Sequence, residues 1–519
     1  MRQRLTMVLV CLAFAPTVAA SDWPMWGRDG ARNMATSEAP LPGTFGTGTP
    51  VKGSDAIDVK GAKNVRWVAK LGSQSYGNVT VADGRVFLGT NNAVPRDPKL
   101  KGDYSVVMAL NERDGSFLWQ LGVPKLGAGK VSDWEFLGIC SSPAVDGDVV
   151  YVVTNRSEVI ALDVRGQANG NQGPFKDEGA YMAGPGKPPL PVGERDGDIL
   201  WRYDMRKDLG VFPHNVTSSS VLIVGDRLFV STSNGVDWSH RNVPAPFSPA
   251  LVVLDKKTGA LLAEETVGIS ERTLHANWSS PAVAKVGKKD VILFGAGDGF
   301  LYGFDPKPTT DAEGLNVLRE LWRYDANPAT YRSVDGKPVP YARRNGPSEI
   351  IATPAVHGGL ACVAIGQDPE HGTGKGSLSC LSPSGEGDRS QAGPSWRFDG
   401  IGRSISTVAI ADGLLVAADL SGRVYGLDAA TGKHLWTHDT GGHIWASPLI
   451  ADKKIYIGNE SGFLTILEAG KTEKVLATLD LYAPIYGSAI AAGGAVYIQT
   501  QTHLWTISSG PTPRRGKRR

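Results

Sequence analysis

A unit that recurs eight times constrains the fold more than any other feature of this 519-residue chain. Residues 422–467, GRVYGLDAATGKHLWTHDTGGHIWASPLIADKKIYIGNESGFLTIL, show the unit. A strand ends in Leu-Asp, a Thr-Gly turn follows, and the next strand carries Trp436. After a loop, Ala-Ser-Pro opens a further strand that leads into a hairpin. Recurrence of this kind indicates a repeat protein, and it overrides the several domains that length alone would suggest.

Two columns of the repeat have eight members each. The first is mostly tryptophan: Trp67, Trp119, Trp201, Ala263, Trp322, Trp396, Trp436 and Ala477. The second is a pair of small residues that opens a strand: Gly77-Asn78, Ser141-Ser142, Ser219-Ser220, Ser279-Ser280, Ala352-Thr353, Ser406-Thr407, Ala446-Ser447 and Gly487-Ser488. Because the tryptophans recur once per unit, we interpret them as packing wedges whose indole N–H groups bond to a neighbouring unit.

Each unit offers about four short strands in which Val, Ile, Leu and Tyr alternate with polar residues between Gly and Asp turns. Such a unit leaves two apolar faces bare, and a ring of eight units buries them all. The sequence therefore predicts an all-β fold, an eight-bladed β-propeller of four-stranded antiparallel blades over residues 64–508. A strand from one terminus is expected to complete the blade begun at the other. The stretch WPMWGRDG (23–30), within the N-terminal segment 21–63, is the candidate for that strand.

Residues 1–20 have the pattern of a secretory signal. Arg2 and Arg4 precede an apolar run from Leu5 to Phe14, and Val18-Ala19-Ala20 resembles a cleavage site. The run is too short to span a membrane, and no later run is long enough. We expect an exported protein, periplasmic or extracellular after cleavage near Ala20.

Charge argues against a nucleic-acid partner. Seven positive charges lie within residues 1–4 and 514–519, so the body between them carries −5 out of a total of +2. A binding surface for nucleic acid would need the opposite sign. The basic tail, residues 509–519, is interpreted as a disordered end; loose adhesion to anionic lipid or polysaccharide is the alternative.

The cysteines do not form a disulfide framework, because only Cys140, Cys362 and Cys380 follow the signal. Cys362 and Cys380 fall on two strands of one predicted hairpin. The register expected from the sequence places them one position apart and on opposite faces. This favours buried thiols over a disulfide, although the disulfide stays open.

The Leu-Asp…Thr-Gly…Trp…Ser-Pro…Tyr-Val-Gly cycle resembles the pyrroloquinoline quinone (PQQ) repeat over essentially the whole mature chain. That repeat builds quinoprotein alcohol dehydrogenases and also non-enzymatic propellers, including the lipoprotein scaffold of the outer-membrane β-barrel assembly machinery. FPHNVTSSSV (212–221), STSNGVDW (231–238), LHANWSSPAV (274–283) and GQDPEHG (366–372) are similar to an exported bacterial subfamily that lacks the full dehydrogenase site. The resemblance is specific for the fold and not for an activity.

The resemblance also implies which residues a dehydrogenase would need: a calcium-ligating asparagine, an aspartate in His-Asp-x-Trp that acts as the base, a glutamate and two adjacent cysteines. Asn234 matches the asparagine, whereas Ala276 stands where the aspartate should be. A methyl group neither accepts a proton nor ligates calcium. The glutamate has no match, since Glu158 is expected to belong to a strand, and no two cysteines are adjacent. We therefore expect no catalytic residue.

The residue before each small pair is expected to lie at the channel mouth. These eight residues are Tyr76, Cys140, Ser218, Trp278, Ile351, Ile405, Trp445 and Tyr486. With residues of the preceding loops, they supply the ligand-binding candidates Tyr76, Trp134, Glu135, His214, Asn215, Asn234, His275, Trp278, Arg403, His443, Trp445 and Tyr486. Aromatic and convergent polar groups are typical of a small-ligand pocket. In the alternative interpretation, the aromatic residues only plug the channel.

Metal ligation is a weaker interpretation. His214, His275 and His443 come from three blades without any short ligand spacing. The other weak metal candidates are Asn234, Asp368, Glu370 and His371, and a solvated turn is the default for the last three.

Two long excursions interrupt the repeat. The insert 167–197 is expected to cover one face, with Phe175 and Tyr181 as anchors. The excursion 236–250 carries Trp238 and Phe247, which suit either partner docking or packing on the neighbouring blade.

Taken together, these patterns predict a monomeric, non-catalytic binding or scaffold protein without a confident cofactor. A protein, small molecule or glycan would bind at its top face. The alternative is an oxidoreductase that uses PQQ and calcium in a rearranged site, and a polysaccharide-active enzyme is a third reading.

Overall fold

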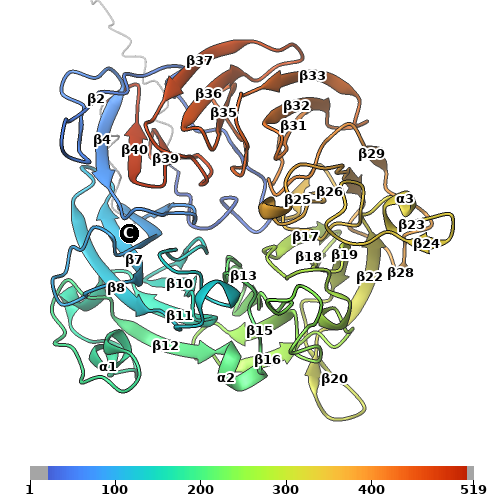
Figure 1. Ribbon diagram of the computed structural model, residues 1–519, viewed down its shortest axis with the longest axis horizontal. Helices are drawn as coiled ribbons and strands as arrows, with labels where there is room; N and C mark the ends of the chain where they lie inside the picture. Colours follow the sequence, from blue (N-terminus) through green and yellow to red (C-terminus); the bar gives the residue numbers. More distant parts are fainter. Residues whose placement is uncertain (1–20, 511–519) are drawn as a thin grey trace, which may run out of the picture.

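Eight blades surround one channel, which confirms the predicted propeller (Figure 1). The computed structural model describes residues 21–510, so the predicted signal, residues 1–20, and residues 511–519 of the basic tail lie outside the described part. The first four blades comprise β5 (Thr80–Ala82), β6 (Arg85–Asn91), β7 (Tyr104–Asn111), β8 (Phe117–Pro124); β9 (Ala144–Asp146), β10 (Val149–Val153), β11 (Glu158–Asp163), β12 (Ile199–Asp204); β13 (Leu222–Val224), β14 (Arg227–Ser231), β15 (Leu251–Asp255), β16 (Leu261–Glu264); and β17 (Ala282–Val286), β18 (Lys289–Gly295), β19 (Phe300–Phe304), β22 (Glu320–Asp325).

The last four blades comprise β25 (Ala355–His357), β26 (Leu360–Ala364), β27 (Leu378–Leu381), β29 (Trp396–Phe398); β30 (Ala409–Ala411), β31 (Leu414–Ala418), β32 (Arg423–Asp428), β33 (His434–Asp439); β34 (Leu449–Ala451), β35 (Lys454–Gly458), β36 (Phe463–Glu468), β37 (Val475–Asp480); and β38 (Ile490–Ala492), β39 (Ala495–Gln499), β40 (His503–Ile507), β4 (Val65–Lys70). Short accessory elements are β1 (Ala35–Thr36), β2 (Thr49–Pro50), β3 (Ile57–Asp58), β20 (Thr309–Thr310), β21 (Asn316–Val317), β23 (Ser333–Val334), β24 (Lys337–Pro338), β28 (Gly387–Asp388), α1 (Glu178–Ala183), α2 (Met205–Leu209) and α3 (Ala329–Arg332). Within residues 21–510, no helix is long and apolar enough to cross a membrane.

The ring closes in its eighth blade, where β4 pairs antiparallel with β40. In Figure 1 the blue β4 therefore lies beside the red β40. A strand from the N-terminal side does complete the blade begun at the C-terminal side, but the candidate stretch 23–30 is wrong. Residues 23–30 instead lie inside the channel and do not form the outer strand of a blade.

We call residues 21–38 the floor segment, since they run along the inner edges of the innermost strands. An unpaired strand edge leaves backbone groups without partners, and this segment supplies partners in all eight blades. Its hydrogen bonds reach Val81, Val145, Val221 (from Arg32), Val283, Val356, Ile410 (from Asn33), Ile450 and Gly493. The Arg32 guanidinium is fully buried and also donates to the carbonyl oxygens of Pro281 (2.9 Å) and Trp26 (2.6 Å).

The tryptophan column confirms the wedge interpretation. All six indoles lie on outer strands and donate to a carbonyl of the next blade: Trp67 to Glu112, Trp119 to Val164, Trp201 to Lys256, Trp322 to Pro383, Trp396 to Ala429 and Trp436 to Gly470. Turn glycines approach four of these rings closely: Gly115 lies against Trp67, Gly166 against Trp119, Gly259 against Trp201 and Gly432 against Trp396. A Cβ on Gly432 would lie 2.3 Å from Cε3 of Trp396, so this turn has no room for a side chain.

The column of small residues has a structural reason as well. The second residue of each pair carries a hydroxyl or amide oxygen that can accept a backbone N–H from the neighbouring blade. Seven such bonds form a belt inside the channel, with acceptors Ser142, Ser220, Ser280, Thr407, Ser447, Ser488 and Asn78. The eighth member, Thr353, accepts a bond from the Trp26 indole at 3.0 Å. The belt therefore joins the floor segment to the ring.

The predicted register of the cysteine hairpin is wrong. Cys362 on β26 lies directly opposite Cys380 on β27, and the two form a disulfide. A shift of one residue moves every side chain of a strand to the other face. The loop between the strands contains a 3-10 turn over Pro369–His371, and such an irregular path hides the register from the sequence.

The insert 167–197 lies at the rim of the ring rather than across a face, with α1 against β8 (Figure 1). Its expected anchors, Phe175 and Tyr181, are partly buried against the core between the first two blades. The Tyr181 hydroxyl donates to Glu158 at 2.7 Å, and Glu158 begins strand β11 as expected.

Candidate functional site

The upper part of the channel is a cavity of about 620 Å³. We call the end at which the innermost strands begin the top. Trp26 of the floor segment lines the cavity together with all eight belt residues. Above the belt, the cavity wall contains all eight residues expected at the mouth: Tyr76, Cys140, Ser218, Trp278, Ile351, Ile405, Trp445 and Tyr486. The repeat therefore places one residue per blade around a single space.

One wall of the cavity is aromatic. The rings of Tyr76 and Tyr486 stack with centroids 4.8 Å apart and planes 9° apart, and the Trp445 ring stands 4.7 Å from that of Tyr486. Burial raises the pKa of the Tyr76 hydroxyl to about 12, so the phenol is neutral at pH 7. This wall offers flat, uncharged surface to a ligand ring.

The charged groups of the cavity wall are acidic. Asp368, Glu370 and Glu460 line it, and no Arg or Lys of the described residues does. Arg403, a predicted ligand-binding residue, is buried and donates instead to the carbonyl oxygens of His371 at 3.0 Å and Gly372 at 3.1 Å. The Arg403 guanidinium therefore holds the loop around His371 in place and does not face the cavity. The cavity thus favours neutral or cationic ligands over anionic ligands.

The remaining predicted residues divide between the cavity wall and other places. Trp134, Asn215, Trp278 and His443 line the cavity. The Glu135 side chain is exposed at the surface. His214, Asn234 and His275 are fully buried beside the wall rather than in it.

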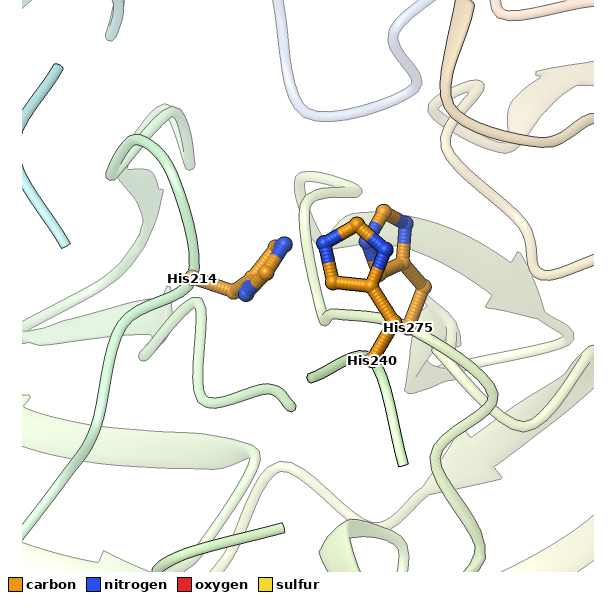
Figure 2. A group of neighbouring side chains, drawn as sticks. All are labelled: His214, His240 and His275. Atoms are coloured by element: carbon orange, nitrogen blue, oxygen red, sulfur yellow. The ribbon is translucent and has the colours of Figure 1, made fainter. Parts of the chain in front are cut away.

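Three imidazoles form a cluster behind this wall, and we call His214, His240 and His275 the histidine cluster (Figure 2). One ring nitrogen of each lies within 4.8 Å of those of the other two. His214 and His275 precede β13 and β17, and His240 comes from the excursion between β14 and β15. His214 and His275 are buried, whereas His240 is exposed.

Hydrogen bonds fix the orientation of the two buried rings. His214 Nδ1 lies 2.6 Å from the Val236 carbonyl oxygen and donates to it. His275 Nδ1 lies 3.1 Å from the Tyr341 hydroxyl, which donates its own proton to Glu349 at 3.0 Å. The hydroxyl therefore accepts from His275, and both rings carry their proton on Nδ1. Within residues 21–510, the Nε2 atoms of His214 and His275 have no hydrogen-bond partner.

Burial keeps both imidazoles uncharged at neutral pH. It lowers the pKa of His214 to about 4 and that of His275 to about 2, and the neighbouring histidines lower the His275 value further. The buried acid behind them behaves in the opposite sense, because desolvation raises the pKa of Glu349 to about 8.

Other polar groups border the cluster. The His371 ring centroid is 5.3 Å from that of His275, and Asp368 Oδ2 is 3.8 Å from His275 Nδ1. Asp368 is buried rather than solvated, and it also lines the cavity, so cluster and cavity share a wall. His443 does not join the cluster; its Nδ1 lies 3.4 Å from Glu460. His240 was not predicted from the sequence. It lies in the loop between the second and third strands of its blade, and such loops lie at the same end of the propeller as the loops of His214 and His275. This shared end is the signal that could have identified it.

The residues present do not fit the calcium and quinone of the dehydrogenases. The Asn234 amide is wholly engaged: its oxygen accepts from Phe212 N at 2.9 Å, and its nitrogen donates to Ala245 and Ser270. The methyl group of Ala276 is buried against Gly235. A quinone that carries three carboxylates would also meet acidic groups in the cavity. Neither Asn234 nor Ala276 therefore offers calcium a free oxygen at the positions that match the dehydrogenase motifs.

Comparisons with known proteins agree with the fold. The family model described as outer membrane protein assembly factor BamB matches residues 56–181 and 343–510, together more than half of the chain. No curated protein sequence matches this chain. Among solved structures, BamB from Moraxella catarrhalis is 14% identical with a TM-score of 0.51, over 85% of this chain and 97% of that one. A europium-containing methanol dehydrogenase is 14% identical with a TM-score of 0.53, over 93% and 90%. Likeness at this identity extends to the fold alone.

Proposed function

This chain belongs to the PQQ-repeat propeller family described by the outer membrane protein assembly factor BamB, and from that premise we propose that it is an exported, non-catalytic binding protein. Its channel cavity takes a small ligand that is neutral or cationic and presents a flat ring. Export follows from the signal pattern of residues 1–20.

The cavity itself carries the proposal. Its volume of about 620 Å³ suits a small molecule, for which pockets span roughly 300–1,000 Å³. The stacked pair Tyr76–Tyr486 offers a face for a sugar or aromatic ring. Glu370 and Glu460 offer acceptors for hydroxyl or ammonium groups. Aromatic faces also attract cations, and the carboxylates act in the same direction.

Two observations favour binding without chemistry. Ala276 provides no general base at the position where the related dehydrogenases have one. The acidic cavity wall opposes the anionic quinone on which their redox chemistry depends.

Tryptophan fluorescence of the purified mature protein tests the proposal. The probes are phenethylamine, a neutral oligosaccharide series, and the quinone with calcium. We expect saturable quenching by the amine or a sugar. Trp445→Ala should weaken that binding about 3- to 10-fold, the usual value of one aromatic contact. Trp238→Ala, which removes an indole that is 63% exposed outside the cavity, is the matched control. Stoichiometric uptake of the quinone with dye-linked alcohol oxidation would refute the proposal, and so would no response to any amine or sugar.

Protein docking at the top face is a second candidate, favoured by one observation. Trp238 and Phe247 on the excursion 236–250 are 63% and 87% exposed, so most of each side chain faces solvent. Exposed aromatic residues of this kind anchor protein partners. A photo-crosslinking residue at Phe247 should give a discrete adduct in exporting cells, while one at Leu315, which is 53% exposed, should not. Equal labelling at both positions would exclude the docking surface.

A further inference from the structure

We propose that the histidine cluster binds one late first-row divalent metal ion of the zinc(II) class through His214, His240 and His275. The inference does not depend on the cavity taking a ligand. It rests on the donor set, the spacing of the donors, the orientation of the rings and the charge around them.

The donor set selects the class of metal. Three neutral imidazoles suit zinc(II) and its neighbours cobalt(II), nickel(II) and copper(II), whereas calcium and magnesium require oxygen. Three histidines from separate loops, with a fourth position for water or another ligand, are an arrangement that zinc adopts in proteins.

The spacing is close to what such an ion needs. Zinc–nitrogen bonds of about 2.0–2.1 Å in a tetrahedron place ligand nitrogens about 3.3 Å apart. The three nitrogens already lie within 4.8 Å of one another. His240 is exposed on an excursion loop, so it can move towards the two buried rings without disturbing the core. His214 and His275 are the fixed side of the site (Figure 2).

The orientation of the fixed rings matches that of metal ligands. In metal sites a ligating imidazole donates its other N–H to a carbonyl or acid, which fixes the tautomer and the ring plane. Here His214 donates to the Val236 carbonyl, and His275 donates to Tyr341, which is held by Glu349. Their two buried Nε2 lone pairs are left without a partner among the residues that the structure describes. Such orphaned polar atoms are costly and uncommon, and a metal ion would satisfy both.

Two buried acidic groups lie next to the proposed metal site. Glu349 Oε1 and Asp368 Oδ2 lie 3.9 and 3.8 Å from His275 Nδ1. A divalent ion would bring positive charge into this buried place, and ionisation of either carboxyl group would offset it. Neither carboxyl is required to be a ligand.

Titration of the untagged, chelator-treated mature protein with cobalt(II) tests the site. We expect one equivalent to bind with the visible absorption of four- or five-coordinate cobalt, and zinc(II) to displace it. His240→Ala should weaken binding by about 100-fold or more while circular dichroism stays unchanged, because the lost ligand is exposed. His434→Ala, an exposed histidine on the outer strand β33, is the matched control and should bind as the wild type does.

Tyr341→Phe gives a second readout, because Tyr341 positions His275 without touching the ion. It should weaken cobalt binding by about 10- to 100-fold and leave one equivalent bound. Absence of stoichiometric binding to the wild type would overturn the site, as would full binding by His240→Ala or equal loss in His434→Ala. Trp445→Ala should leave cobalt binding unchanged, so failure of the cavity proposal and failure of the metal site are distinguishable.

Discussion

The contact between a turn glycine and a wedge tryptophan allows a quantitative prediction about how the blades hold together. Gly432 lies in the turn between β32 and β33 with φ +71°, and a Cβ added to it would point at the ring of Trp396 in the preceding blade. Gly413 turns between β30 and β31 of the same blade with φ +76°, and a Cβ there would meet nothing within 4 Å. Substituting each by alanine costs the same backbone strain, about 1–2 kcal/mol. The pair therefore isolates the packing contact.

The extra cost at position 432 follows from the distance. A new Cβ at 2.3 Å from Cε3 of Trp396 forces the ring away by about 1 Å before ordinary contact near 3.4 Å is restored. Overpacking of this kind costs about 1–3 kcal/mol. Movement of the ring also weakens the 3.2 Å bond from Trp396 Nε1 to Ala429, which is worth about 1 kcal/mol. Gly432→Ala should thus lose about 2–4 kcal/mol more than Gly413→Ala.

Thermal unfolding followed by tryptophan fluorescence measures the difference. The unfolding entropy of about 2.1 cal/mol/K per residue amounts to about 1 kcal/mol/K for a chain of this size. The midpoint for Gly432→Ala should therefore lie about 2–4 °C below that for Gly413→Ala. Equal midpoints for the two variants would refute the wedge as a source of stability.

Three further predictions concern single groups. Cys362 and Cys380 lie 18 positions apart, and reduction of their disulfide should lower the free energy of unfolding by about 3 kcal/mol. Peptide mapping without reductant checks the link. Free thiols at both positions would contradict it. Arg32→Met leaves the carbonyl oxygens of Trp26, Val221 and Pro281 without their donor. We therefore expect the free energy of unfolding to fall by about 3 kcal/mol or more and the floor segment to be digested faster by proteases. An unchanged digestion pattern would contradict this role of Arg32. Desolvation raises the folded-state pKa of Glu265 to about 7 from its ordinary value of 4.5, so the stability that its protonated form provides is fully present below about pH 4.5 and is lost as the pH rises through 7. Denaturation of the wild type and Glu265→Gln at pH 5 and pH 8 should show the variant gaining about 3 kcal/mol relative to the wild type at the higher pH, and a constant difference would contradict the shift.

Recurring residues made the ring predictable from sequence. The six outer-strand tryptophans repeat one contact between neighbouring blades, and seven of the small pairs repeat another, so many copies reinforce one interpretation. The floor segment has no such repetition. Its partners are hundreds of residues away, as with Asn33 and Ile410, and its short stretches pair with strands that already look complete. The sequence pattern therefore pointed to residues 23–30 as the closing strand instead of β4.

The site was only partly predictable for a related reason. The residue before each small pair lies at a fixed point of the repeat, and the cavity wall follows from that point, as Tyr76 and Trp445 show. The histidine cluster depends on how irregular loops fold back. His240 lies in a turn at φ +55°, where no periodic pattern operates, and His443 turned out to face Glu460. Loop geometry, unlike strand alternation, leaves little trace in residue spacing.

The floor segment has a consequence for the order of folding. It contacts the first blade and the eighth, so its full set of partners exists only when the last strands of the chain have been made and the circle is shut. A circle lacking any one blade would leave part of residues 21–38 without a docking place. Residues 21–38 are therefore the last to gain their final contacts, and docking of this segment completes assembly of the propeller.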